Sequence, residues 1–182
     1  MQVKKYRYFM GDFETTVYKG QVNTEVWASA VVEFKTEDVK IFHSIGETFD
    51  YLVSLDSDII IYYHNLQFDA AFWLSYLMVD LAWQPAAHVP KPNESTSEFE
   101  WILMKNMRNK TYTYSISDMG QWYRIVIKVN DRYIEIRDSL KLLPFKVSRI
   151  GKSFATKHKK LEMEYKGFRY AGCESTPEEQ QY

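Results

Sequence analysis

The feature that most constrains the fold is a pair of apolar strands that each end near carboxylates. The run Ile59–Tyr63 is continuously β-branched and aromatic, which is typical of a central strand buried on both faces. Asp69 follows at the start of a segment with helical periodicity. An earlier expected strand runs into Asp12 and Glu14, which share one side of a regular strand because they are two residues apart. The chain therefore places three carboxylates where strands stop and solvent begins.

Composition predicts one folded domain. The 182 residues are enough for a sizeable core, and 46% hydrophobic with 16% aromatic residues excludes the disordered class. The net charge of -1 gives no global basic field. Cys173 is the single cysteine and cannot form an internal disulfide, which favours a reducing cytosol over export. No signal-peptide core follows the basic N-terminus, and no apolar run reaches the roughly 18 residues of a membrane span.

The hydrophobic pattern predicts a mixture of strands and helices. Strands are expected over residues 6–13, 26–32, 39–45, 59–63, 99–107, 112–117, 122–129 and 133–136. Helices are expected around residues 49–53, over 68–79 and over 147–155. The first three strands suggest an antiparallel meander, and Asn109-Lys110 and Asn130-Asp131 are expected hairpin turns. The segment Pro85–Ser97, which holds three prolines with polar residues, predicts an exposed loop.

The C-terminal segment carries a helix start signal. Thr176-Pro177-Glu178-Glu179 offers an N-cap hydroxyl, a proline at the first helical position and the reciprocal glutamate of a capping box. Only three residues follow, which is too few for a helix to repay its nucleation cost in isolation. We therefore expect the sequence to be a fragment of a longer chain, cut inside a helix.

Asp12, Glu14 and Asp69 have the chemistry of ligands for hard divalent cations. Paired carboxylates repel each other, and Mg²⁺ or Mn²⁺ would remove that repulsion while keeping water and phosphate in its coordination shell. Taken alone, these residues leave other readings open. Asp12 and Glu14 could be a solvated strand end, and Asp69 could be an acid in the first turn of a helix, where the dipole favours it.

Three further features also allow two readings. The segment from Lys146 to Lys160 holds six basic residues and no acid, so it is either a solvated helix face or a phosphate contact surface. Phe68 could stack on a nucleic-acid base or pack in the core. His64 could bind a metal, but we expect a structural hydrogen bond instead. Cys173 has no flanking His or Cys pattern, and we assign it no role.

Five segments resemble, in order, the 3'–5' exonuclease domain of protein-primed, bacteriophage-type family B DNA polymerases. Asp12-Phe13-Glu14-Thr15-Thr16 resembles the first motif, and Tyr63–Asp69 resembles the second. Gly120–Tyr123 and Asp138–Phe145 resemble two segments of the phage-type branch, the latter its Ser-Leu segment. Thr176–Tyr182 resembles the run that enters the third motif. Each motif is weak alone, but together they cover essentially the whole chain.

The resemblance implies an α/β, RNase H-like exonuclease fold, with a mixed central sheet flanked by helices, as one domain over residues 1–182. It implies a two-metal site for Mg²⁺ or Mn²⁺, with Asp12, Glu14 and Asp69 as ligands, that clamps the scissile phosphate and activates water. Tyr182 would help to position that water, and Lys160 would be a further catalytic residue. The residues implied to contact the 3' end of single-stranded DNA are Thr15, Asn65, Phe68, Ser139, Leu140 and Tyr165.

The sequence departs from the family pattern in two places. The aspartate of the third motif would lie four residues beyond Tyr182, and the segment Pro85–Glu98 is longer than in the phage enzymes. We therefore expect one weakened metal site, weak or absent cleavage by this chain, and no polymerase domain within it.

The resemblance implies a parent protein that removes mismatched 3' nucleotides. Its partners would be a polymerase domain and a terminal protein, without a membrane, in the cytoplasm of a bacterial host of a phage or mobile element. Two alternatives differ in class. The chain could bind single-stranded DNA without cutting it, or it could have acquired an interaction role through the Pro85–Glu98 loop.

Overall fold

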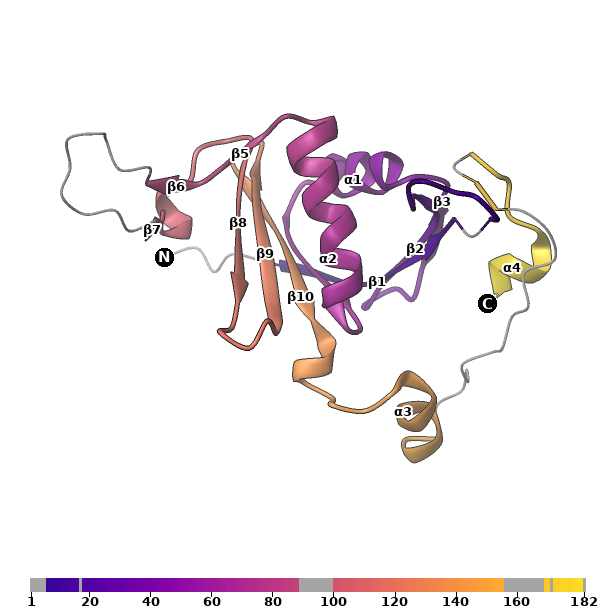
Figure 1. The fold of residues 1–182 in the computed structure, drawn as a ribbon. Helices are drawn as coiled ribbons and strands as arrows, with labels where there is room; N and C mark the ends of the chain where they lie inside the picture. The colour runs from indigo at the N-terminus through magenta and orange to yellow at the C-terminus, as the bar shows by residue number, and fades with distance from the viewer. Residues whose placement is uncertain (1–5, 17, 89–99, 156–168, 171, 182) are drawn as a thin grey trace.

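The computed structural model describes residues 6–16, 18–88, 100–155, 169–170 and 172–181. Its centre is an eight-stranded mixed sheet with the order β3-β2-β1-β4-β10-β9-β8-β5 (Figure 1). The strands are β1 (Tyr6–Thr15), β2 (Val26–Glu33), β3 (Val39–Phe42), β4 (Asp58–Tyr63), β5 (Gln84–Pro85), β8 (Thr111–Ile116), β9 (Trp122–Val129) and β10 (Arg132–Asp138). The short strands β6 (Ala87–His88) and β7 (Glu100–Trp101) form a separate pair.

Strand β4 lies between β1 and β10 and runs parallel to both. Its Ile59 and Ile61 are fully buried, so the expected central strand is confirmed. The pairs β1–β2 and β2–β3 are antiparallel, which confirms the expected meander. Because β1, β4 and β10 point the same way, their carboxyl ends meet at one edge of the sheet, where α/β proteins commonly bind ligands.

Two helices cover one face of this sheet (Figure 1). They are α1 (Ile45–Ser54) and α2 (Leu66–Ser75), and α2 continues as the π-helix η1 (Tyr76–Asp80). Ser44 caps α1, since its Oγ accepts a hydrogen bond from the amide of Glu47 at 3.1 Å. Phe49, Leu52 and Trp73 from these helices join the apolar side chains of β1, β4, β9 and β10 in one core. This packing fixes α2, and with it Asp69, against the sheet.

Short helical elements follow the sheet or link its parts. They are the 3-10 helices η2 (Met104–Asn106) and η3 (Ser139–Lys141) and the helices α3 (Val147–Ser153) and α4 (Pro177–Gln181). The expected helix start at Thr176 is confirmed, because its Oγ1 accepts from the amide of Glu179 at 3.3 Å while Glu179 Oε2 accepts from the amide of Thr176 at 2.8 Å. Among the described residues, no helix is long and apolar enough to span a membrane.

Several expected boundaries are wrong, and tertiary contacts explain them. Of the expected strand over 99–107, the described residues 100–107 form a strand only at Glu100–Trp101, and the backbone then turns into η2. Met107 and Met104 instead pack on Val126 and Tyr133, in a small second core on the other face of the sheet. The expected strand over 39–45 ends at Phe42, since α1 begins at Ile45.

The turn predictions had mixed outcomes. Asn130 and Asp131 both have positive φ, at 48° and 59°, and they form the expected hairpin between β9 and β10. Asn109-Lys110 is not a hairpin turn, because it leads from η2 into β8, and its asparagine side chain bonds Asp131 instead. The loop predicted over Pro85–Ser97 is wrong for Pro85, which lies in β5, and for Ala87–His88, which form β6, and residues 89–97 lie outside the described part.

The backbone at Gly11 lies very close to the ring of Tyr63 in the core. A Cβ placed on it would lie 2.6 Å from Cζ and 2.8 Å from Oη of Tyr63, and 3.0 Å from Ile61. The fully buried Tyr63 ring therefore occupies the space where a side chain at position 11 would go. A glycine at this point in β1 lets β4 present a tyrosine next to Asp12.

We predict that Gly11→Ala destabilises the fold by about 1–3 kcal/mol, because a methyl group there overpacks a rigid ring. Urea denaturation followed by far-ultraviolet circular dichroism measures this free energy of unfolding. Gly46→Ala, in α1, is the matched control, since the heavy atom nearest to a Cβ placed there is Oη of Tyr76, at 3.4 Å. The control should stay within about 1 kcal/mol of wild type. Equal stability of the two variants would contradict the packing described for Tyr63.

Candidate active site

The candidate site lies where β1, β4 and β10 end. The last β1 residue paired with β4 is Met10, opposite Tyr62, so Asp12 stands two residues beyond that pairing. The end of β4 pairs with the end of β10 through Tyr63 and Asp138. Two carboxylates from strands distant in sequence thus come to one edge of the sheet.

The orientation of Asp12 and Glu14 follows from the residue between them. Phe13 is 5% exposed, and its ring centroid lies 5.1 Å from Tyr63 and 5.6 Å from Trp73. Because side chains alternate along a strand, Asp12 and Glu14 are directed away from this aromatic core. Asp12 is exposed and Glu14 is half-buried, so the expectation that they share one side of the strand is confirmed.

Asp69 is the most perturbed acid of the site. It lies in the first turn of α2 and is 4% exposed. Burial is the largest cause that raises its pKa to about 7, and the negative charge of Asp12 is the next; Asp138 and Glu14 add smaller effects in the same direction. A hydrogen bond with the backbone opposes the shift. Asp69 is therefore no ordinary solvated helix acid, because it is held near other carboxylates in a desolvated position.

Asp138 is a site residue that our sequence reasoning missed. It is 6% exposed, and its Oδ1 accepts hydrogen bonds from the amides of Asn65 at 3.1 Å and Leu140 at 2.9 Å. One carboxylate thus holds the start of α2 and the start of η3 together. The sequence does give a reason to suspect Asp138, since it opens the Ser-Leu segment and follows an apolar run. Only the pairing of β10 with β4, however, brings it to Asp69.

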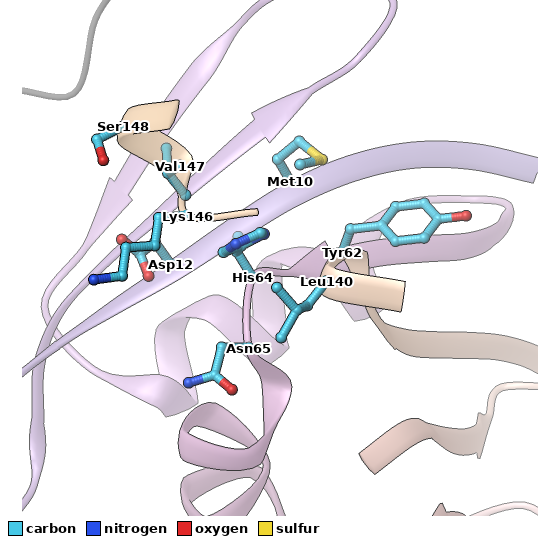
Figure 2. Close-up of a pocket in the computed structure, with 10 residues that line it drawn as sticks. Met10, Asp12, Tyr62, His64, Asn65, Leu140, Lys146, Val147 and Ser148 are labelled. Carbon is cyan, nitrogen blue, oxygen red and sulfur yellow. The ribbon is translucent and has the colours of Figure 1, made fainter. Parts of the chain in front are cut away.

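A second set of hydrogen bonds fixes the segment after β4. The hydroxyl of Ser139 donates to the carbonyl of Tyr63 at 3.1 Å and lies 3.1 Å from Nδ1 of His64. The structural hydrogen bond expected of His64 is thereby confirmed. Asn65 takes a left-handed conformation, with φ 69° and ψ 58°, as the chain turns from β4 into α2. This turn directs the Asn65 side chain outward, beside His64 and Leu140 (Figure 2).

A pocket of about 730 Å³ lies beside these groups on the sheet face away from α1 and α2. It brings together three of the predicted site residues, Asp12, Asn65 and Leu140 (Figure 2). The remaining lining residues are Met10, Gly11, Tyr62, His64, Lys146, Val147 and Ser148. The lining is thus mostly neutral and apolar, with an acid at Asp12 and a cation at Lys146.

The other predicted DNA contacts and catalytic residues do not line this pocket or lie outside the described residues. Phe68 is 51% exposed and contacts Phe72 edge-on at 5.3 Å, so the core reading of Phe68 is wrong. Thr15 is half-buried and follows an irregularity in the β1–β2 pairing. Ser139 is buried, and its hydroxyl serves the hydrogen bonds described above. Lys160, Tyr165 and Tyr182 lie outside the described residues.

The four acids of the site, Asp12, Glu14, Asp69 and Asp138, are of the type that binds hard divalent cations. All four acids present carboxylate oxygens. The pKa of Asp69 is raised first by burial and then by the charge of Asp12, and a bound cation would offset both effects. The hydroxyl of Tyr63 is fully buried next to Gly11, and its pKa is raised well above the ordinary value, first by burial and then by the charges of Asp69 and Asp12. Within the described part of the chain, however, no three His, Cys, Asp or Glu side chains already form a group that could hold a metal ion.

Comparison with known proteins identifies the family. A mixed sheet with two helices on one face and acids at the carboxyl ends of its parallel strands is an RNase H-like exonuclease fold. The profile of the family described as "DNA polymerase type B, organellar and viral" matches residues 53–181. The chain therefore belongs to this family, and the resemblance stated from the motifs is confirmed.

The most similar relatives include phage DNA polymerases. The chain is 34% identical over 180 residues to the DNA polymerase of Bacillus phage Nf, covering 96% of this chain and 27% of the relative. It is 32% identical over 177 residues to the DNA polymerase of Bacillus phage phi29, covering 94% of this chain and 27% of the relative. The chain thus spans about a quarter of the length of these relatives.

Solved structures agree with this relationship. Phi29 DNA polymerase complexed with single-stranded DNA superposes with a TM-score of 0.74 at 28% identity, over 97% of this chain and 28% of that one. The same polymerase complexed with primer-template DNA gives a TM-score of 0.75 at 28% identity, over 98% and 29% of the two chains. The described fold is therefore shared with one part of a much longer polymerase.

We predict that the metal-free chain loses stability as the pH rises. Folding raises the pKa of Asp69 from 3.8 to about 7, so the folded state holds its proton more tightly than the unfolded state. The stabilising contribution is complete below pH 4 and is lost as the pH rises through 7. Asp69→Asn, which is always neutral, should be more stable than wild type at pH 8 by roughly 2–4 kcal/mol.

Urea denaturation in EDTA at pH 4.5 and pH 8 tests this prediction. The advantage of Asp69→Asn should shrink strongly at the lower pH. Asp50→Asn, at an exposed position of α1, is the matched control and should show no such pH dependence. An equal effect of Asp69→Asn at both pH values would contradict the environment described for Asp69.

Proposed function

We propose that this chain is the 3'–5' exonuclease part of a protein-primed, phage-type DNA polymerase, and that residues 1–182 form one exonuclease-like domain. It would hold the 3' end of single-stranded DNA at the carboxyl edge of the sheet and hydrolyse the terminal phosphodiester bond. One observation carries the proposal. In a member of this polymerase family, an aspartate of α2 lies near carboxylates from the ends of β1 and β10, and its pKa is raised first by burial and then by the charges of those carboxylates.

The proposed metal ligands are Asp12, Glu14 and Asp69, for two Mg²⁺ or Mn²⁺ ions. When bound, such ions neutralise the carboxylates, lower the pKa of bound water and stabilise charge on the attacking and leaving oxygens. Asp69 must lose its proton to act as a ligand, so its raised pKa makes metal affinity depend on pH. Lys160 and Tyr182 are proposed to act on the reacting groups, as the resemblance implies.

The chain's own residues are proposed to orient the DNA. Asn65 and Leu140 line the pocket with Asp12, where they can contact the sugar and base of the 3'-terminal nucleotide. Phe68 is exposed at the first turn of α2, where its ring can stack on a base. Thr15, Ser139 and Tyr165 complete the proposed contacts. Asp138 holds the backbone of Asn65 and Leu140 in place through its two hydrogen bonds.

The partners and location of the parent protein are also proposals, and they are based on the relatives. The relatives are DNA polymerases about four times as long as this chain, so we propose a polymerase domain and a terminal protein as partners in the parent protein. The proposed location is the cytoplasm of a bacterial host, where a phage polymerase copies its genome.

We expect Asp12→Ala to abolish any Mn²⁺-dependent shortening of a 5'-labelled single-stranded oligonucleotide by the purified chain, since it removes one of the three proposed ligands. Denaturing electrophoresis measures the products. Asp50→Ala, which removes an exposed carboxylate on α1, should leave the rate unchanged. Cleavage that persists in Asp12→Ala would refute the proposed metal site.

A different pattern would support the alternative function. If wild type binds the oligonucleotide but does not shorten it with either Mg²⁺ or Mn²⁺, the chain is a single-stranded-DNA-binding module with an exonuclease-like fold. Binding of the same oligonucleotide in EDTA, followed by fluorescence anisotropy, separates this outcome from a chain that does not recognise DNA.

We predict that Phe68→Ala weakens single-stranded DNA binding by about 5- to 100-fold, because stacking of one base on an aromatic ring is worth about 1–3 kcal/mol. Its thermal stability should change little, since half of the side chain is exposed. Phe68→Trp should retain most of the affinity. Val79→Ala, at another exposed apolar position on the same helical segment, is the control and should bind like wild type. Unchanged affinity of Phe68→Ala would exclude stacking at this position.

A further inference from the structure

Two arginines flank one buried glutamate on the sheet face that carries the pocket. Glu135 of β10 is 3% exposed. Its Oε2 accepts hydrogen bonds from Nε of Arg137 at 3.1 Å and from Nη2 at 2.6 Å, and Nη1 of Arg124 lies 3.7 Å from the same oxygen. The group therefore carries two positive charges against one negative charge, a local excess that the net charge of the chain conceals.

The two arginines have different relations to Glu135. Arg137 already supplies the buried carboxylate with two charge-assisted hydrogen bonds, which are enough to compensate its burial. Arg124 is too far from Glu135 for a hydrogen bond, and 49% of its side chain is exposed. The hydrogen bonds to Glu135 thus account for the guanidinium of Arg137, whereas that of Arg124 is half-exposed and makes only a longer ion pair.

Strand register connects this pair to the pocket. Met10 of β1 lies opposite Tyr62 of β4, Tyr62 lies opposite Arg137, and Arg137 lies opposite Arg124 of β9. Paired residues face the same side of a sheet, so these four side chains form one row across four strands. Burial lowers the pKa of Arg137, but the hydrogen bond and charge of Glu135, followed by those of Tyr62, raise it above its ordinary value.

The row begins inside the candidate site. Met10 and Tyr62 both line the pocket that contains Asp12, and Figure 2 shows Asp12 and Tyr62 on opposite sides of it, with His64 between them. Strand spacing and rise place the Cα of Arg137 about 12 Å from that of Asp12. A nucleic-acid strand advances about 3.4 Å per nucleotide when stacked, so this distance corresponds to about three or four nucleotides.

We propose that Arg124 and Arg137 form a binding site for the backbone phosphates of the single strand whose 3' end lies at Asp12, about three or four nucleotides from that end. This inference rests on the proposed exonuclease function and adds a phosphate subsite to it. The planar guanidinium matches a phosphate with two parallel hydrogen bonds. Glu135 holds Arg137 in place, so less side-chain freedom is lost when the strand binds.

Fluorescence anisotropy of a 5'-labelled ten-nucleotide oligo(dT), in EDTA and at several salt concentrations, tests this site. Arg124→Gln and Arg137→Gln should each weaken binding about fivefold and lower the slope of log affinity against log salt by about 0.7. Arg124→Lys should retain the slope, because it keeps the charge. A thymidine dinucleotide used as a competitor is too short to reach the arginines, so its inhibition constant should be the same for wild type and both variants.

Lys128→Gln is the matched control. Lys128 lies on the same face of β9, four residues from Arg124 along the strand, where its ammonium group packs 4.1 Å from the centre of the Tyr133 ring. It should bind like wild type and keep the full salt slope. If Arg137→Gln fails to fold, Arg124→Gln decides the test. Arg124 makes no hydrogen bond to Glu135, so its replacement should not disturb the fold. Thermal melting curves establish the folding of every variant.

The outcomes separate this inference from the proposed function. If Phe68→Ala weakens binding while both arginine variants bind like wild type with an unchanged salt slope, the strand does not pass the arginine pair, and the subsite is refuted while the function stands. If Lys128→Gln loses as much affinity as Arg124→Gln, the effect is general charge and the subsite is also refuted. If wild type does not bind the oligonucleotide at all, the proposed function and the subsite both fail.

Discussion

The parallel pairing of β4 with β1 and β10 determines where the acids of this chain lie. Without it, Asp12 and Asp138 would stand on strands 126 positions apart in sequence, with no reason to meet. The pairing brings both to one edge of the sheet, and the left-handed turn at Asn65 returns the chain so that Asp69 faces them. The apolar core under α1 and α2 then makes this arrangement costly to undo.

The same arrangement reduces the stability of the folded chain. A carboxylate buried near three others is destabilising in the absence of a cation, as the raised pKa of Asp69 records. The surrounding structure tolerates this loss of stability for two reasons. Asp138 accepts hydrogen bonds from two backbone amides, and Phe13 packs β1 into the aromatic core. Strain of this kind, held in place by unstrained packing, is typical of sites that acquire their full charge balance only on binding a ligand.

Local sequence patterns predicted the elements that depend on local physics. The apolar run of β4, the alternation around Phe13 and the capping box at Thr176 all appear in the structure as expected. The expected strand over 99–107 was wrong because its apolar residues serve a second core that forms only when β9 and β10 supply Val126 and Tyr133. Asp138 could have been suspected from its place at the start of the Ser-Leu segment, but only strand register brings it to the site. The pair Arg124–Arg137 could not be found from sequence, since strand register alone makes the two residues neighbours.

The contact between Gly11 and Tyr63 has a consequence for how this chain can evolve. The two residues belong to different motifs, but the ring of one fills the side-chain position of the other. A larger residue at position 11 is compatible with the fold only where position 63 carries a smaller group. Among homologues the two positions should therefore vary as a pair, with a side chain appearing at 11 together with loss of the hydroxyl or the ring at 63.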